Sequence, residues 1–185
     1  VNVTGAWSNI IRQSADPFAR PIVQASKGVH LICNKLPFDE AFTLETPQDK
    51  RTFFIMPYQG QTLIGTTDTP YSGDLNHVIA TQEDIDYLVE AAQFYVKSFK
   101  KSDILDTFAG LRPLIAQSAT SMSSVSRELT LETNRTGLIS MVGGKYTTYR
   151  KMAEQCVDLV VKRLEKSGHG PFSPCDTKTR RLPEC

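Results

Sequence analysis

The strongest constraint on the fold is a series of short strand-like segments joined by tight turns. In residues 27–34, the side chains of one strand face, Val29, Leu31 and Cys33, alternate with those of the other, His30, Ile32 and Asn34. Three further β-type segments follow at 41–46, 51–58 and 61–67. Pro47-Gln48-Asp49-Lys50 and Gln59-Gly60 are turn sequences between them. Because these connections are too short to hold a helical crossover, the sequence predicts antiparallel pairing.

One amphipathic helix is predicted in the middle of the chain, over residues 81–99. Thr81 and Asp84 have the spacing of a capping box. The apolar residues behind them recur every three or four positions, at Ile85, Leu88, Val89, Ala92, Tyr95, Val96 and Phe99.

The rest of the pattern completes the fold class. It predicts strands at 107–115, 123–132 and 137–142, and a last helix at 147–166 whose buried stripe is Met152, Ala153, Cys156, Val157, Val160 and Leu164. Residues 1–7 are predicted to be a strand that runs into a glycine turn. The predicted class is α+β, with an antiparallel sheet of about five or six strands from residues 27–67 and 107–132 and helices on one side.

The composition is that of an ordinary globular protein and argues against two classes of partner. The 185 residues are 40% hydrophobic and 22% charged, with a formal net charge of +1, so no basic surface for nucleic acid is indicated. No apolar run approaches the roughly 20 residues of a membrane span, and the first residues lack a secretory signal. Cys33 and Cys156 lie in apolar patterns and are predicted to be buried free thiols in a reducing compartment, and no metal-site spacing is present.

Residues 143–150, Gly-Gly-Lys-Tyr-Thr-Thr-Tyr-Arg, follow an apolar strand and open the last predicted helix. Glycines let a ligand approach the backbone, and the free N–H groups of a helix start attract anions, to which Lys145 adds a positive charge. The spacing is not that of a P-loop, because a glycine would be needed where Ile139 stands. The alternative is a plain strand-to-helix turn with a solvated lysine.

Two arginines are candidates for binding an anion. Arg112 lies in an apolar run flanked by glycine and proline, so its charge needs either a protein carboxylate or a ligand as partner. In a hairpin centred between residues 119 and 120, Arg127 would face Arg112 with their Cβ atoms about 5 Å apart. A phosphate between the two planar guanidinium groups would turn their repulsion into binding. Glu128 is an alternative partner.

His30 lies in the middle of the first predicted strand. A lone strand histidine is more often structural than catalytic, although its near-neutral pKa suits proton abstraction from a hydroxyl. Residues 65–69 form a polar strand end that is ambiguous by itself.

Seven segments in this order, spanning about residues 2–166, together resemble the FAD-dependent glycerol-3-phosphate dehydrogenases. Each is weak alone, and the series is specific. They are Asn2-Val3-Thr4-Gly5-Ala6-Trp7, Ser26-Lys27-Gly28-Val29-His30-Leu31, Met56-Pro57-Tyr58, Ile64-Gly65-Thr66-Thr67-Asp68-Thr69, Ala109-Gly110-Leu111-Arg112-Pro113-Leu114, Ser126-Arg127-Glu128 and Gly143-Gly144-Lys145-Tyr146-Thr147-Thr148-Tyr149-Arg150.

The resemblance implies a reaction and a place for it. The family oxidises sn-glycerol 3-phosphate to dihydroxyacetone phosphate, passes a hydride to FAD and sends the electrons to membrane quinone. Its enzymes are peripheral proteins on the cytoplasmic face of the bacterial inner membrane, or lie on the mitochondrial inner membrane. The glycerophosphate oxidases, which reduce oxygen, are an alternative, as are flavin oxidases of amino acids or sarcosine. A non-enzymatic domain that binds phosphorylated metabolites is a third reading.

The resemblance also implies roles for single residues. Arg112 and Arg127 would hold the substrate phosphate, His30 would sit by the reacting hydroxyl, and Lys145 would lie between substrate and flavin. The catalytic set is therefore His30, Arg112 and Lys145, and the substrate-binding set is Arg112, Arg127 and Lys145. The expected FAD contacts are Thr4, Gly5, Gly143, Gly144, Lys145, Thr147 and Thr148.

A domain organisation follows from the same resemblance. Residues 1–20 and 136–166 would belong to a Rossmann-like FAD-binding domain, with strands 1–4 and 137–142 side by side. Residues 21–135 would be the substrate-binding domain, and 167–185 a linker toward a further domain. The Gly-x-Gly-x-x-Gly fingerprint of FAD-binding folds is absent from this sequence and both ends look cut. We therefore expect the 185-residue chain by itself to carry no FAD and to be inactive.

Overall fold

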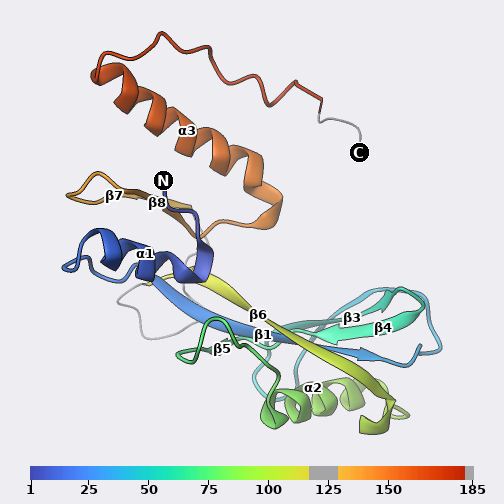
Figure 1. The fold of residues 1–185 in the computed structure, drawn as a ribbon. Helices are drawn as coiled ribbons and strands as arrows, with labels where there is room; N and C mark the ends of the chain where they lie inside the picture. The colour runs from blue at the N-terminus through green and yellow to red at the C-terminus, as the bar shows by residue number, and fades with distance from the viewer. Residues whose placement is uncertain (117–128, 182–185) are drawn as a thin grey trace. The chain divides into compact units, whose positions relative to one another are not determined.

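The computed structural model describes residues 1–116 and 129–181 of the chain. These residues form two compact units (Figure 1). One unit comprises Val1–Val23 and Leu114–Cys185, and the other comprises Gln24–Pro113.

The unit Gln24–Pro113 is built on a six-stranded sheet. Along one path the strand order is β2-β3-β4-β1-β5, and β6 also pairs with β1. The pairs β1–β4, β2–β3 and β3–β4 are antiparallel, as predicted for residues 27–67, and β1–β5 is antiparallel too. The strands are β1 (Val23–Cys33), β2 (Phe42–Glu45), β3 (Thr52–Tyr58), β4 (Gln61–Gly65), β5 (Thr69–Pro70) and β6 (Ile104–Ile115).

Helix α2 (Gln82–Tyr95) covers one face of this sheet, as Figure 1 shows. The predicted capping box is confirmed, because Thr81 and Asp84 exchange hydrogen bonds at its start. A short 3-10 helix, η2 (Lys101–Asp103), leads from there into β6. The core between helix and sheet contains Val29, Leu31, Cys33, Phe53, Ile55, Ile64, Leu88, Val89, Ala91, Ala92 and Phe99, with Ile85 and Val96 partly buried against it.

The opposite sheet face, here called the open face, follows from the strand alternation. Val29 and Leu31 point into the core, so Gly28 and His30 lie on the other side of β1. Gly65 of β4 lies on the same face as His30, because the two residues are paired across the strands. The open face is thus the part of the sheet where the predicted histidine stands.

The other unit holds the remaining helices and a two-stranded sheet. A parallel bridge joins Asn2 to Ser140, which confirms that the segments 1–4 and 137–142 lie side by side. Its elements are η1 (Gly5–Trp7), α1 (Ser8–Ala15), β7 (Thr130–Thr133), β8 (Ile139–Val142), η4 (Tyr146–Thr148) and α3 (Tyr149–Lys166). The prediction of a strand over residues 1–7 was wrong beyond this bridge, because a helical turn begins at Gly5.

One predicted strand pairing was also wrong. Residues 130–132 do not extend the six-stranded sheet, because β7 pairs antiparallel with β8. The turn between them explains this, since the Asn134 side chain accepts hydrogen bonds from the backbone N–H groups of Thr136 and Leu138 and closes a tight hairpin. The compact unit with the six-stranded sheet ends at Pro113, and the assignment of 21–135 to a substrate-binding domain stays a prediction.

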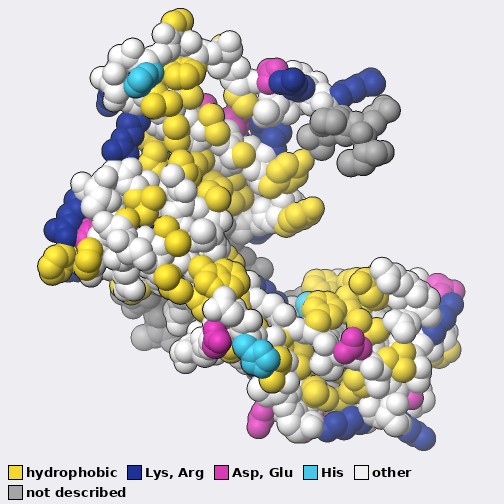
Figure 2. Space-filling model, viewed as in Figure 1, with side chains coloured by type: hydrophobic (Ala, Val, Ile, Leu, Met, Phe, Trp, Pro, Cys, Tyr) yellow, Lys and Arg dark blue, Asp and Glu magenta, His cyan; other side chains and the backbone are white. Residues whose placement is uncertain are grey.

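Helix α3 differs from its predicted burial. Cys156 is buried, as expected, but Val157 and Leu164 of the predicted stripe are exposed. Hydrophobic side chains are visible along this helix at the surface (Figure 2). In the part of the chain that the structure describes, no helix is long and apolar enough to cross a membrane.

Candidate functional site

A β-bulge lies where β4 ends and β5 begins. His30 of β1 pairs with Gly65, and Lys27 of β1 pairs with Thr69. Between these pairs β1 has two residues, whereas the facing chain has three, residues 66–68. The extra residue is Thr66, because Thr67 bonds to Val29 and Asp68 then stands opposite Gly28. Bulges of this kind re-aim side chains and are frequent beside active sites.

The bulge is where Arg112 of β6 binds. Arg112 Nη2 donates to Thr66 Oγ1 at 2.9 Å, and Nη1 donates to the Thr67 carbonyl at 3.2 Å. The carboxylate of Asp68 forms an ion pair with Nη1 at 3.5 Å. The protein carboxylate anticipated as one partner of Arg112 is therefore Asp68, and the Arg112 side chain is 28% exposed.

Two glycines make room for the site. A Cβ on Gly28 would stand 2.5 Å from Arg112 Nη2, so the guanidinium lies over this glycine. A Cβ on Gly65 would stand 2.4 Å from His30 Cδ2, so the imidazole lies over the second glycine. Because Gly28 and Gly65 are both on the open face, Arg112 and His30 are on the open face too.

His30 is half-buried and stacked. Its ring lies 4.9 Å from that of Phe108, with only 11° between the planes. Burial lowers the pKa of His30, and the positive charge of Arg112 lowers it further. His30 Nδ1 is buried and has no hydrogen-bond partner among the described residues. With a pKa lowered from 6.5, the imidazole is neutral at neutral pH and can accept a proton.

The structure brings together two of the predicted site residues, His30 and Arg112. Arg127, the predicted second phosphate ligand, lies outside the described residues, as does its alternative partner Glu128. The pairing of Arg112 with Arg127 stays a prediction. Lys145 and the other predicted flavin contacts belong to the unit that contains Val1–Val23 and Leu114–Cys185.

Within that unit, two glycine turns share one edge. Asn2 and Ser140 pair in parallel, and Gly5 and Gly143 each follow three residues later. Gly5, Gly143 and Gly144 all have positive φ angles, which glycine adopts without strain. Each turn is followed by a 3-10 turn and then a helix, α1 or α3. Glycine turns that lead into helices leave room and free N–H groups for an anion or nucleotide, so the turns fit contacts to part of an FAD molecule.

The remaining predicted flavin contacts are at the surface of these turns. Lys145, Thr147 and Thr148 are exposed, and so is Thr4. The Thr148 hydroxyl donates to the Lys145 carbonyl at 2.9 Å and accepts from the Lys145 N–H at 3.2 Å. This pair fixes the turn that presents the lysine, whichever ligand it meets.

Sequence reasoning missed two residues that shape these sites. Asn2 is buried, and its Oδ1 accepts from both the N–H and the hydroxyl of Thr4, so it holds the turn before Gly5. The local signal was the Asn-x-Thr spacing, which is typical of an Asx turn. Asp68 was also missed, because its partner Arg112 is 44 residues away and no local pattern links them.

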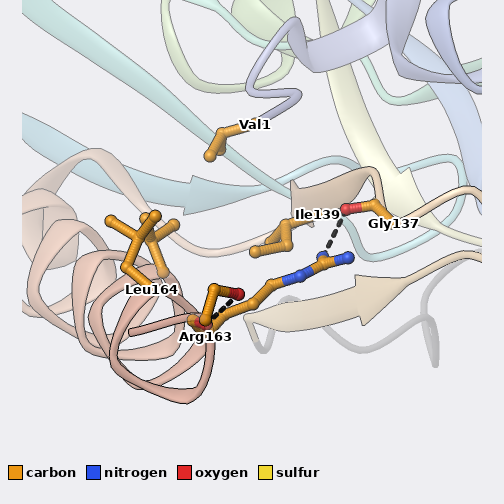
Figure 3. Close-up of a pocket in the computed structure, with 7 residues that line it drawn as sticks. Val1, Gly137, Ile139, Arg163 and Leu164 are labelled. Carbon is orange, nitrogen blue, oxygen red and sulfur yellow. Dashed lines mark hydrogen bonds between the residues drawn. The ribbon is translucent and has the colours of Figure 1, made fainter. Parts of the chain in front are cut away.

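A pocket of about 270 Å³ lies elsewhere in the same unit as Asn2 (Figure 3). Arg163 borders it and donates to the carbonyl of Gly137. Its lining is Val1, Gly137, Ile139, Val160, Arg163, Leu164 and Ser167, and it includes none of the predicted site residues. Over residues 1–116 and 129–181, no group of acidic, histidine and cysteine side chains is arranged to hold a metal ion.

Comparisons with curated proteins agree with this arrangement. The chain is 40% identical over 182 residues to the aerobic glycerol-3-phosphate dehydrogenase of Bacillus subtilis (strain 168) and 38% identical to that of Staphylococcus aureus (strain USA300). Each match covers 96% of this chain and 33% of the relative, so the chain spans about a third of the length of these relatives.

Solved structures are similar as well. The X-ray structure of the glycerol-3-phosphate dehydrogenase from Bacillus halodurans, complexed with FAD, matches with a TM-score of 0.76 at 35% identity, over 89% of this chain and 32% of that chain. The iminodiacetate oxidase from Chelativorans sp. BNC1 matches with a TM-score of 0.50 at 16% identity, over 95% of this chain and 44% of that chain, which shows a shared fold alone.

The family itself is identified by a match over most of the chain. The model of the FAD dependent oxidoreductases matches residues 1–150 of the 185. The matched range contains the glycine turns beside the Asn2–Ser140 bridge, and it contains His30 and Arg112. The chain therefore belongs to the FAD dependent oxidoreductase family.

Proposed function

We propose that this chain is part of an enzyme that oxidises sn-glycerol 3-phosphate to dihydroxyacetone phosphate with FAD. The observation that carries the proposal is the placement of a neutral imidazole and a guanidinium on one open sheet face, His30 over Gly65 and Arg112 over Gly28. An alcohol that bears a phosphate needs these two groups, a proton acceptor and an anion ligand. The similarity to aerobic glycerol-3-phosphate dehydrogenases supports the same substrate.

Each residue has a defined task in this proposal. Arg112 binds the phosphate through its planar fork, with Arg127 as a second ligand, and thereby orients the glycerol carbons. His30 Nε2 accepts the proton of the reacting hydroxyl, which a neutral imidazole can do at neutral pH. Lys145 is a further positive group for the substrate and the cofactor.

FAD, when bound, supplies the acceptor for the hydride that leaves the carbon. The residues that would contact it are Thr4, Gly5, Gly143, Gly144, Lys145, Thr147 and Thr148, of which the three glycines have backbone angles that permit close approach. The electron acceptor proposed for the whole enzyme is membrane quinone, and the proposed location is the cytoplasmic face of the inner membrane, as a peripheral protein.

An anaerobic reduction experiment on the full-length protein tests the function. Glycerol 3-phosphate should bleach the visible absorbance of bound flavin, and glycerol, glycine and sarcosine at equal concentration should not. The rate at which the reduced flavin is reoxidised is then compared for a quinone analogue and for oxygen. Faster reoxidation by the quinone identifies a dehydrogenase, and faster reoxidation by oxygen identifies the oxidase alternative. A flavin that sarcosine reduces and glycerol 3-phosphate does not would refute the proposal.

A further inference from the structure

We propose that Asp68 is a positioning residue that holds the Arg112 guanidinium over Gly28. The bulge at Thr66 places the Asp68 carboxylate where it can do so. This inference rests on the proposed function, because it assigns Arg112 the task of binding the substrate phosphate. The sequence alone assigned no role to residues 65–69, which form a polar strand end. In the structure the side chains of Thr66, Thr67, Asp68 and Thr69 each make a contact.

The first step is the backbone. Thr66 is the extra residue of the bulge, and Asp68 stands opposite Gly28 on the open face. A cross-strand neighbour of Gly28 would normally meet a side chain there, but Gly28 has none. The space is filled by the guanidinium of Arg112, which arrives from β6.

The second step is the set of contacts. Thr66 Oγ1 accepts from Nη2, and the Thr67 carbonyl and the Asp68 carboxylate accept from Nη1. The bulge therefore offers acceptors to both terminal nitrogens of the fork. Because a planar fork recognises phosphate only in the correct orientation, fixing the plane of the guanidinium fixes the phosphate position.

The third step is the rigidity of Asp68 itself. The hydroxyl of Ser26, a fully buried residue, donates to Asp68 Oδ1. Arg51 Nη1 donates to the backbone carbonyl of Asp68. Next to Ser26, Lys27 is anchored on the core side by a buried ion pair with Asp84. The carboxylate is thus held from its side chain and from its backbone.

The charge of Asp68 has a second effect. At 3.5 Å it compensates the guanidinium when no phosphate is bound, so that Arg112 does not leave the sheet for solvent. Without the Asp68 carboxylate, Nη1 keeps its bond to the Thr67 carbonyl but loses the ion pair, so the guanidinium is more mobile before substrate binds. Part of the substrate's binding energy is then used to order the guanidinium. We expect a larger KM for glycerol 3-phosphate with a smaller change in kcat.

A double-mutant cycle in the full-length protein tests this role. The proteins are wild type, Asp68→Ala, Arg112→Ala and the double variant, with the surface variant Asp39→Ala as a control, since that carboxylate is 80% exposed. Asp68→Ala should lower kcat/KM for glycerol 3-phosphate about tenfold in the wild-type background and change it less than about twofold in the Arg112→Ala background. Equal losses in both backgrounds would overturn the positioning role.

A measurement without turnover separates this proposal from the proposed function. Inorganic phosphate should raise the midpoint of thermal unfolding of the wild type, raise it less for Asp68→Ala and not at all for Arg112→Ala. A wild type that shows this shift but does not oxidise glycerol 3-phosphate contradicts the function and keeps the positioning role. If Asp68→Ala does not fold, Thr66→Val removes the acceptor of Nη2 and should show the same coupling to Arg112. A shift identical in wild type and Thr66→Val would then count against the proposal.

Discussion

Arg112 lies over Gly28, and a Cβ on Gly28 would stand 2.5 Å from Nη2 of that arginine. The obstructing group is the far end of a long side chain, so Gly28→Ala should fold and displace the guanidinium. We predict a loss of about tenfold in kcat/KM for glycerol 3-phosphate, equivalent to about 1.4 kcal/mol of transition-state binding. Steady-state kinetics of the full-length variant measure it.

Gly110→Ala is the matched control for this prediction. Gly110 lies on the same strand as Arg112, and a Cβ there would meet no atom within 4 Å. It should keep the wild-type kcat/KM. If both glycine variants lose activity equally, the space over Gly28 has no special importance.

His30 should make the stability of the protein depend on pH. Its folded pKa lies below the ordinary 6.5, with burial as the main cause and Arg112 as the second. The unfolded chain therefore binds this proton more readily, so the contribution of His30 is complete above pH 6.5 and is lost as the pH falls through the folded pKa. His30→Gln should reduce the fall in unfolding free energy between neutral and mildly acidic pH, measured by urea denaturation. The exposed His77→Gln should leave that slope unchanged, and an equal effect of both would contradict the assignment.

The ion pair of Lys27 and Asp84 should be important for stability. Both side chains are less than a tenth exposed, at 8% and 5%. Lys27→Met leaves the buried Asp84 carboxylate without its ion-pair partner, which costs about 3–5 kcal/mol in such cases. Denaturant unfolding measures the change, and Lys35→Met, at an exposed pair, should alter stability by less than about 0.5 kcal/mol. A loss for Lys27→Met as small as for Lys35→Met would show that the buried pair is not tightly coupled.

The cysteines should differ in reactivity. Burial raises the pKa of Cys33 to about 12, so almost none of it is thiolate at neutral pH. Cys175 is exposed. Brief treatment with iodoacetamide followed by peptide mass spectrometry should find Cys175 modified and Cys33 unmodified until denaturant is added. Modification of Cys33 in the folded protein at the rate of Cys175 would show that the sheet core opens readily.

The antiparallel sheet and α2 were predictable because their signals are local. Turns of a few residues leave β2, β3 and β4 no other pairing, and Thr81 with Asp84 marks a helix start wherever it occurs. Helix α1 has no such signal, since its segment depends on distant contacts. Asn9 accepts from the N–H groups of Ile22 and Val23, and Arg12 is buried in an ion pair with Glu132.

The candidate site was predictable only in part for the same reason. His30 and Arg112 stood out as a histidine and an arginine in apolar strands. The bulge at Thr66 was not visible, because it is a mismatch between two strands and not a property of either one. The mismatch places Asp68 opposite Gly28, so the role of Asp68 can be recognised only from the registers of β1 with β4 and β5.

The substrate preference of Arg112 variants tests the account most directly. In the full-length protein, kcat/KM is measured for glycerol 3-phosphate and for glycerol, which lacks the phosphate. Arg112→Ala should lose about 2–5 kcal/mol of transition-state binding with glycerol 3-phosphate and little with glycerol. Arg112→Lys should recover little, because a point charge does not reproduce the fork. Equal losses on both substrates, or full recovery by lysine, would contradict a phosphate site at Arg112.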